Sequence, residues 1–162
     1  EVDVETGKTK VLRYTTACDV GVIGNRLSVE GQAYGGLSHS IGFALSENYN
    51  NELRENNIAA CGIPQITDIP DDFNVLFHES KRPNGPHGSC GCSECFQSSN
   101  HMAVINAIKN ACGVRVFALP ATPDKVKAGL EALKRGEEII PEKYYLGTDF
   151  EEELDFIKAN PI

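Results

Sequence analysis

Residues 28–47 read SVEGQAYGGLSHSIGFALSE and have the apolar spacing of one long helix. Ser28 is suited to be the N-cap of this helix. Glycine is frequent in the segment, and each glycine costs about 1 kcal/mol relative to alanine in a helix interior. That cost indicates a close approach to the helix backbone, either by another helix or strand or by a ligand phosphate at the helix N-terminus. The glycines concerned are Gly31, Gly35, Gly36 and Gly42.

Strands and helices are predicted on both sides of this helix. Upstream, residues 1–5 and 10–17 alternate like the two strands of a hairpin around a turn at Thr6-Gly7-Lys8. Together with the downstream segments they indicate an α+β fold of mixed strands and helices. The downstream predictions are a strand at 73–79, an irregular loop at 83–94, a helix at 98–112 that ends at Gly113, a strand at 114–119, and a helix that begins at Thr122-Pro123-Asp124 and ends at Lys134-Arg135-Gly136.

The chain has 162 residues, 41% of them hydrophobic and 23% charged, which is the size and composition of one soluble globular domain. It has no apolar run long enough to span a membrane, and because its first residues lack the basic and apolar regions of a signal peptide, we expect none. Six cysteines in a chain of this length without an export signal favour a reducing compartment, so we expect a cytoplasmic protein. Because there is no initiator Met, we also expect a segment or processed part of a larger protein.

The net charge of −8 is concentrated near the C-terminus, where residues 137–162 carry eight acids and two bases. The near-neutral remainder lacks the basic face that nucleic-acid binding needs, so no nucleic-acid partner is expected. Aromatic and aliphatic residues among these acids argue against plain disorder. We therefore expect residues 136–162 to form an extended acidic arm that packs on a neighbouring chain.

The loop at 83–94 is the candidate for a chemical site, because irregular loops often carry functional residues. It ends at Glu94, whose small and apolar neighbours favour poor solvation and a raised pKa, as a general base needs. An exposed loop glutamate is the alternative interpretation. A zinc or iron–sulfur centre is also open, although the spacing matches no common zinc arrangement with two pairs of ligands. Its candidate ligands are Cys90, Cys92 and Cys95, with His87 and His101 nearby.

Three motifs, in this order, resemble the C-terminal part of the molybdenum-binding subunit of the xanthine oxidase and aldehyde oxidoreductase family. The first comprises CDVG at residues 18–21 and NRLSVEGQAYGG at residues 25–36. The second comprises GPHGSCGCSE at residues 85–94, SSNH at residues 98–101 and AVINAI at residues 103–108. The third is GVRVFALPATP at residues 113–123. Because three motifs agree in order and spacing, chance is a poor explanation for the resemblance.

The resemblance implies that residues 1–135 are the C-terminal portion of a molybdopterin-binding catalytic domain and that Glu94 is its catalytic base. No residue of this chain is expected to ligate the metal. Two segments are implied to contact the pterin cofactor. The first consists of Gly24, Asn25, Ser28, Val29, Glu30, Gly31 and Gln32, and the second of Cys90, Gly91, Cys92 and Ser93.

The implied cofactor is molybdopterin, as its cytosine dinucleotide, with molybdenum bearing oxo, hydroxo and sulfido or selenido ligands. The implied reaction is a water-derived hydroxylation of an aldehyde or N-heterocycle, by an enzyme active only within a larger assembly. The implied partners are the rest of the molybdenum subunit, an iron–sulfur subunit or domain and, in some assemblies, an FAD subunit. The alternative function is a non-catalytic structural or zinc-binding subunit. For the thiols of the second motif, small buried groups are favoured over redox-sensitive residues and cofactor contacts.

Overall fold

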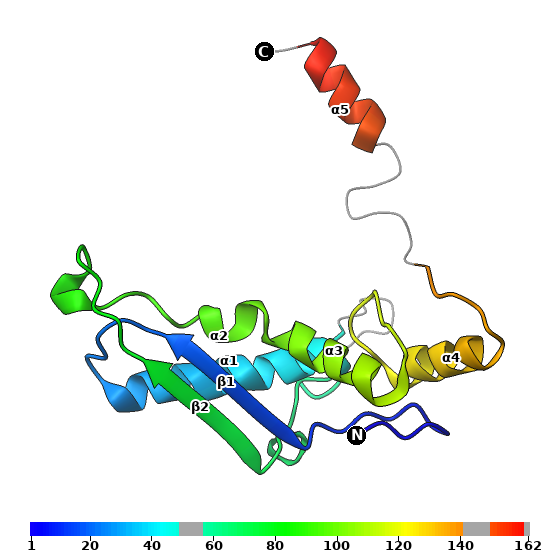
Figure 1. The fold of residues 1–162 in the computed structure, drawn as a ribbon, viewed down its shortest axis with the longest axis horizontal. Coiled ribbons are helices and arrows are strands. Elements are labelled where there is room, and N and C mark those ends of the chain that lie inside the picture. Colours follow the sequence, from blue (N-terminus) through cyan, green and yellow to red (C-terminus); the bar gives the residue numbers. More distant parts are fainter. Residues whose placement is uncertain (49–56, 141–149, 161–162) are drawn as a thin grey trace.

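The computed structural model describes residues 1–48, 57–140 and 150–160, and it confirms a mixed α+β fold (Figure 1). Short 3₁₀ helices accompany the regular elements, and both lie in connecting segments. None of the described helices has the length and apolar content needed to cross a membrane. The elements are β1 (Arg13–Asp19), α1 (Arg26–Leu45), η1 (Ile66–Asp68), β2 (Asp72–His78), η2 (Pro86–Gly88), α2 (Cys95–Ser98), α3 (Asn100–Cys112), α4 (Pro123–Lys134) and α5 (Phe150–Ala159).

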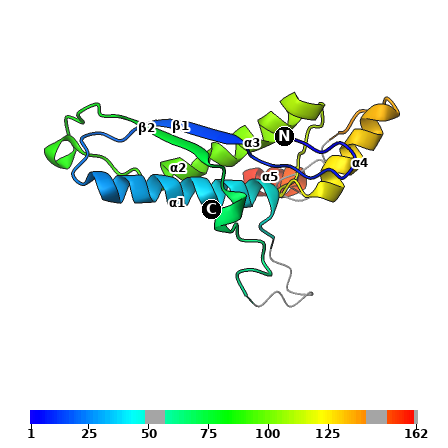
Figure 2. The same ribbon diagram turned by 90° about the horizontal axis from the view of Figure 1, so that it is seen from below.

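The two strands form a small parallel sheet. β1 pairs with β2 in a register that sets Arg13 opposite Asp72 and Asp19 opposite His78. Parallel strands need a long crossover connection, and α1 lies in that connection. Figure 2 shows both strands on the same side of α1, with α2 and α3 beside this helix. Because the strands are parallel, their carboxyl ends lie at the same edge of the sheet. The loops that follow β1 and β2 therefore begin side by side.

The predicted N-terminal hairpin is only partly correct. Gly7 has a φ of 75° in the expected turn, and Val2 forms an antiparallel bridge with Thr9. At residue 10 the predicted strand still pairs with residue 1, since the N–H of Lys10 donates to the carbonyl oxygen of Glu1 at 3.0 Å. From Arg13 onward, however, the strand pairs with β2 and not with residues 1–5. Alternation along a strand indicates which face is buried but not which strand is its neighbour.

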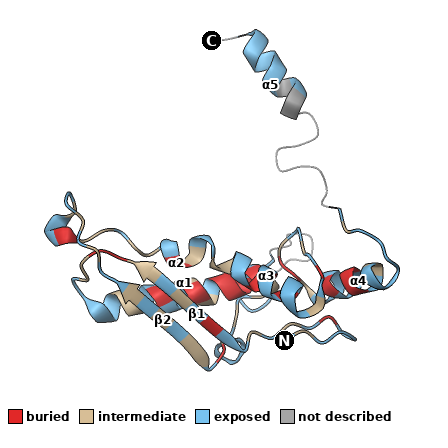
Figure 3. Cartoon of the chain, in the orientation of Figure 1, coloured by how far each residue is buried: buried red, intermediate tan, exposed pale blue. Residues whose placement is uncertain are grey.

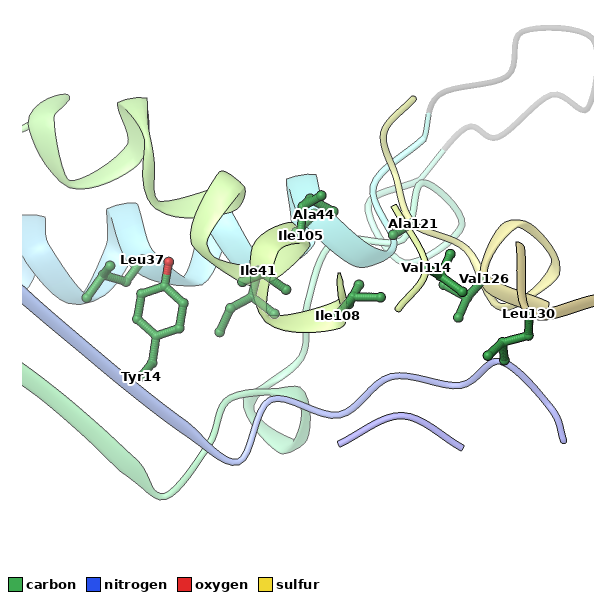
Figure 4. Packing of buried hydrophobic residues seen from close by; sticks show 11 residues of the cluster. Tyr14, Leu37, Ile41, Ala44, Ile105, Ile108, Val114, Ala121, Val126 and Leu130 are labelled. Carbon is green, nitrogen blue, oxygen red and sulfur yellow. The ribbon is translucent and has the colours of Figure 1, made fainter. Parts of the chain in front are cut away.

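The main hydrophobic core lies between the sheet, α1, α3 and α4 (Figures 3 and 4). Tyr14 of β1 is buried in it, and its hydroxyl donates a hydrogen bond to the backbone oxygen of Asn100 at the start of α3. Burial raises the pKa of Tyr14 to about 12. The buried members of this core are Tyr14, Leu37, Ile41, Ala44, Val104, Ile105, Ile108, Val114, Ala121, Val126 and Leu130.

The long glycine-rich helix begins earlier than predicted. Asn25, rather than Ser28, is the N-cap: its backbone is extended, and its side-chain oxygen accepts the N–H of Ser28 at 3.0 Å. Close packing accounts for two of the glycines, because a Cβ at Gly36 would lie 2.9 Å from Phe96 Cβ and one at Gly42 would lie 2.6 Å from Pro64 Cδ. A Cβ at Gly31 or Gly35 would meet nothing within 4 Å, so packing within this chain does not account for these two.

The predicted helix at 98–112 is interrupted at Ser99, so that a short α2 precedes α3. Its predicted stop is confirmed, because Gly113 adopts the left-handed conformation with a φ of 82°. The strand predicted at 114–119 is wrong. Lys125 Nζ donates to the carbonyl oxygens of Ala118 and Pro120, both at 3.0 Å, so these groups do not face a neighbouring strand.

The last two helices differ in how they relate to the core. α4 follows its sequence signals closely, with Thr122 as N-cap, Pro123 at the first turn and Gly136 in the left-handed conformation after its end. It contributes Val126 and Leu130 to the core. α5 lies in the predicted acidic arm, and its described side chains are all exposed (Figure 3). Residues 141–149 of the arm lie outside the described residues.

Candidate functional site

Backbone hydrogen bonds bring the two predicted cofactor segments to the same end of the molecule. Gly21 and Ser89 form an antiparallel bridge. The N–H of Val22 donates to the carbonyl oxygen of Gly88 at 3.0 Å, and the hydroxyl of Ser89 donates to the carbonyl oxygen of Val22 at 2.7 Å. The connection that leads into α1 is therefore joined directly to the loop that leads to Glu94.

A second, smaller hydrophobic core contacts both predicted cofactor segments. Its buried members are Val20, Ala33 and Phe96. Val29 of the first predicted segment and Cys92 of the second both pack against it. The ring of Phe96 meets that of Phe77 edge-on, with centroids 6.0 Å apart, which anchors α2 on β2. Because Phe96 belongs to the helix that follows Glu94, the position of this glutamate depends on this core.

Asp19, at the end of β1, joins the segments around the site. Its carboxylate accepts hydrogen bonds from the N–H groups of Gly21 and Ser80, both at 3.1 Å, and from the Ser80 hydroxyl. It also forms an ion pair with Arg82, whose Nη2 lies 3.1 Å from Asp19 Oδ2. The bonds from Ser80, then that from Gly21, hold the pKa of Asp19 well below its usual range. Sequence reasoning missed the ion pair between Asp19 and Arg82. The motif at residues 18–21 includes Asp19 but gives no signal for Arg82.

Glu94 lies immediately before α2 and is exposed. The hydroxyl of Ser93 donates to Glu94 Oε2 at 2.6 Å. This bond, and then the backbone N–H of Glu94 itself, lowers the pKa of its carboxyl group. The expectation that poor solvation raises the pKa of Glu94 is therefore wrong for this chain. Its assignment as general base stays a prediction.

The start of α1 offers backbone N–H groups and an open surface to a ligand. The N–H groups of Arg26 and Leu27 have no hydrogen-bond partner among the described residues, and such groups suit an anion. A Cβ added at Gly24, Gly31 or Gly35 would meet nothing within 4 Å, so this surface is open to a bulky group. The residues present therefore fit the implied cofactor.

Individual residues of the first segment have distinct surroundings. Arg26 Nε pairs with Glu30 Oε1 at 2.8 Å, and its guanidinium lies 4.9 Å from the centre of the Phe77 ring. Gln32 is exposed, as are Gly24 and Ser28. Among the described residues, no hydrogen bond or ion pair joins Glu94 to any of these side chains. The two segments are thus neighbours in the fold, joined through the small core and not through a hydrogen bond or ion pair of Glu94 within the described residues.

The second predicted segment contains two cysteines, Cys90 and Cys92, and Cys95 follows it closely in the sequence. A hydrogen bond to Cys90, and then the charge of Asp19, raises the pKa of Arg82. Burial is the main cause that raises the pKa of Cys92. Within residues 1–48, 57–140 and 150–160, no group of three or more His, Cys, Asp or Glu side chains is arranged to hold a metal ion. The geometry therefore gives the zinc-binding alternative no support.

Two hollows lie elsewhere on the molecule. One, of about 330 Å³, lies between the N-terminal residues, β1 and α3, and includes Val11 and Ala107 in its lining. The other, of about 520 Å³, is lined by residues around Ile63 and Pro123. Neither includes Glu94 or the predicted cofactor contacts.

Comparison with known proteins defines the class. The sequence profile of the molybdopterin cofactor-binding domain matches residues 1–70. The aldehyde oxidoreductase of Megalodesulfovibrio gigas is 45% identical over 133 residues, which are 82% of this chain and 14% of that protein. The chain is thus a part of a molybdopterin-binding domain.

Solved structures agree with this class. The aldehyde oxidoreductase of Desulfovibrio desulfuricans superposes with a TM-score of 0.77 at 44% identity, over 79% of this chain and 14% of that one. Quinoline 2-oxidoreductase from Pseudomonas putida superposes with a TM-score of 0.72 at 28% identity, over 80% of this chain and 17% of that one. The chain belongs to the xanthine oxidase and aldehyde oxidoreductase family, and it matches a fragment of that family's larger members.

Proposed function

We propose that this chain contributes part of the molybdenum site of a hydroxylase, with Glu94 as the general base. The observation that carries the proposal is the small core of Val20, Ala33 and Phe96, which supports both the start of α1 and the turn before Glu94. A base and a cofactor must be held at a constant separation for proton transfer to be efficient. One shared core provides that constancy for two segments that lie far apart in the sequence.

The proposed cofactor is a molybdopterin, as its cytosine dinucleotide, with a sulfido or selenido ligand on the metal. When bound, it supplies a two-electron oxidation in which the oxygen added to the substrate comes from water. The N–H groups at the start of α1 would bind the anionic part of the cofactor, and Gln32 would offer a donor and an acceptor to its heterocycle. The turn at Cys90, Gly91, Cys92 and Ser93 would line the pterin and the metal.

The role assigned to Glu94 is to take the proton from the water-derived nucleophile. The Ser93 hydroxyl lowers the pKa of Glu94, which favours the ionised carboxylate that can accept a proton and also makes it a weaker base. The same hydrogen bond restricts the orientation of the carboxylate. Ser93 is thus proposed as the positioning residue for the base.

The proposed substrate is an aldehyde or an N-heterocycle. The relatives described above are named for an aldehyde and for quinoline, and the one named for an aldehyde has the higher identity. An aldehyde is therefore the first substrate to test. Because the chain spans 14% of that relative, activity is proposed only for an assembly with the remaining molybdenum subunit, an iron–sulfur subunit or domain and, in some assemblies, an FAD subunit.

Replacing Glu94 by Gln in the complete assembly tests the proposal. Gln keeps the shape of the side chain and removes its basicity, so turnover of an aldehyde should fall by about 10²–10⁴ while molybdenum content is unchanged. Steady-state kinetics and elemental analysis of the same preparation give the two measurements. Glu131→Gln, an exposed substitution on α4, is the matched control and should leave both unchanged. If Glu94→Gln with full molybdenum content turns over within about threefold of the original protein, the role of Glu94 must be abandoned.

A further inference from the structure

Two cysteines from distant parts of the sequence meet beside Glu94. Cys18 is near the end of β1, and Cys95 is the first residue of α2. Their sulfur atoms lie 3.2 Å apart. A disulfide bond is close to 2.0 Å long, so the two sulfur atoms need to approach by about 1.2 Å to bond. Both residues carry free thiols in this structure.

The surrounding groups favour this pair over others in the same cluster. The thiol of Cys95 donates to the carbonyl oxygen of Cys92 at 2.7 Å, which holds its sulfur in place. Among the described residues, neither Cys90 nor Cys92 makes a sulfur–sulfur hydrogen bond with Cys95. In this chain Cys95 is an exposed residue and Cys18 is half-buried.

We infer that Cys18 and Cys95 are a redox-active pair that forms a reversible disulfide with a low-molecular-weight disulfide of the glutathione class as oxidant. One thiolate of the pair attacks the small disulfide, forms a mixed disulfide and releases one small thiol. The other sulfur then displaces the second small thiol and closes the bond. The two cysteines lose two electrons and two protons in total, and the small disulfide is reduced to two thiols.

The bond would tie the end of β1 to the residue that follows Glu94. Burial of the sulfur, and then its contact with Cys18, raises the pKa of Cys95 to about 12, which keeps this thiol protonated at neutral pH. A protonated thiol is a slow nucleophile, and uncatalysed disulfide exchange itself takes minutes to hours, so the incubation is followed on that timescale. The inference concerns modification of the chain and does not depend on the proposed catalytic role of Glu94.

Peptide mapping of the native assembly tests the inference. The reduced protein is incubated with oxidised glutathione, alkylated under denaturing conditions and digested without reduction by trypsin and a glutamate-specific protease. Cleavage after Glu94 separates Cys95 from Cys90 and Cys92. Most of the Cys95 peptide should appear joined to the Cys18 peptide, with the loss of two hydrogen atoms, and dithiothreitol should release both.

Cysteine substitutions give the controls. Cys18→Ser or Cys95→Ser should abolish the joined peptide. Cys112→Ser should leave it unchanged, because the thiol of Cys112 lies on α3 and donates to the carbonyl oxygen of Ile108 at 3.2 Å. Peptide mapping of the protein without substitutions is enough to overturn the inference. It fails if Cys95 is recovered alkylated, joined to Cys90 or Cys92, or as a stable mixed disulfide with glutathione.

Discussion

Asp19 joins the segments around the candidate site through hydrogen bonds and an ion pair. Its carboxylate bonds to Gly21, Ser80 and Arg82, and so it connects the end of β1 with the segment that follows β2. The hydrogen bonds that form only in the folded protein depress its pKa. A carboxyl group with a depressed folded pKa stabilises the protein at pH values above its unfolded pKa, and this contribution is lost as the pH falls towards the folded pKa.

We therefore predict that acid destabilises the native protein in part through Asp19. Between about pH 5 and pH 3, the midpoint of thermal unfolding should fall more steeply for the original protein than for Asp19→Asn. Asp19→Asn should also be less stable at neutral pH, because it lacks the charge that pairs with Arg82. Asp71→Asn, an exposed change just before β2, serves as the control. Parallel acid curves for the original protein and Asp19→Asn would contradict the prediction.

The packing of α1 against α2 requires a residue without a side chain at position 36. A Cβ at Gly36 would lie 2.9 Å from Cβ of Phe96, which is fully buried and held by Phe77. The neighbouring Gly35 has no atom within 4 Å of such a Cβ. The two adjacent glycines thus separate the effect of packing from the effect of helix propensity.

Gly36→Ala should destabilise the protein by about 1–3 kcal/mol, because overpacking forces Phe96 and α2 away from α1. Gly35→Ala should not be destabilising, since alanine gains about 1 kcal/mol in helix propensity. Denaturant unfolding of the complete protein measures both free energies. Equal losses for the two variants would show that contact with Phe96 does not explain the glycine at position 36.

At the scale of the whole molecule, the acidic arm packs on the main core at its start, through Ile139, and its helix α5 belongs to neither core. In α5, the side chains of Phe156 and Ile157 are 68% and 63% exposed. Large apolar groups so exposed on a helix favour contact with another chain. We keep the division into a domain at 1–135 and an arm at 136–162 as a proposal.

Deleting residues 137–162 should weaken assembly with partner chains and leave molybdenum content per assembled complex unchanged. Native mass spectrometry gives the first measurement, and elemental analysis gives the second. The double substitution Phe156→Ser with Ile157→Ser should reproduce the effect. Lys158→Ala should not, because it removes only an exposed ion pair with Asp155. Unchanged assembly after the deletion would rule out a packing role for the arm.

The sequence alone determined those features whose causes lie within one or two turns of chain. Thr122, Pro123 and Gly136 delimit α4, and Gly113 ends α3, because caps act through neighbouring backbone groups. The family was also readable from the sequence, since its motifs are short and local. The cofactor contacts and the role of Glu94 were inferred from that resemblance and are still predictions.

Only the tertiary structure decided which distant segments meet. Nothing local to β1 specifies that it pairs in parallel with β2, or that Asp19 reaches Arg82 and Cys18 reaches Cys95. The lowered pKa of Glu94 depends on the rotamer of Ser93 and on exposure, which spacing does not reveal. The segment at 114–119 likewise has strand composition but pairs with no strand among the described residues, and at its end Lys125 binds the carbonyl oxygen of Ala118. Such outcomes follow from packing of the whole chain, where burial and pairing across long sequence separations outweigh local preference.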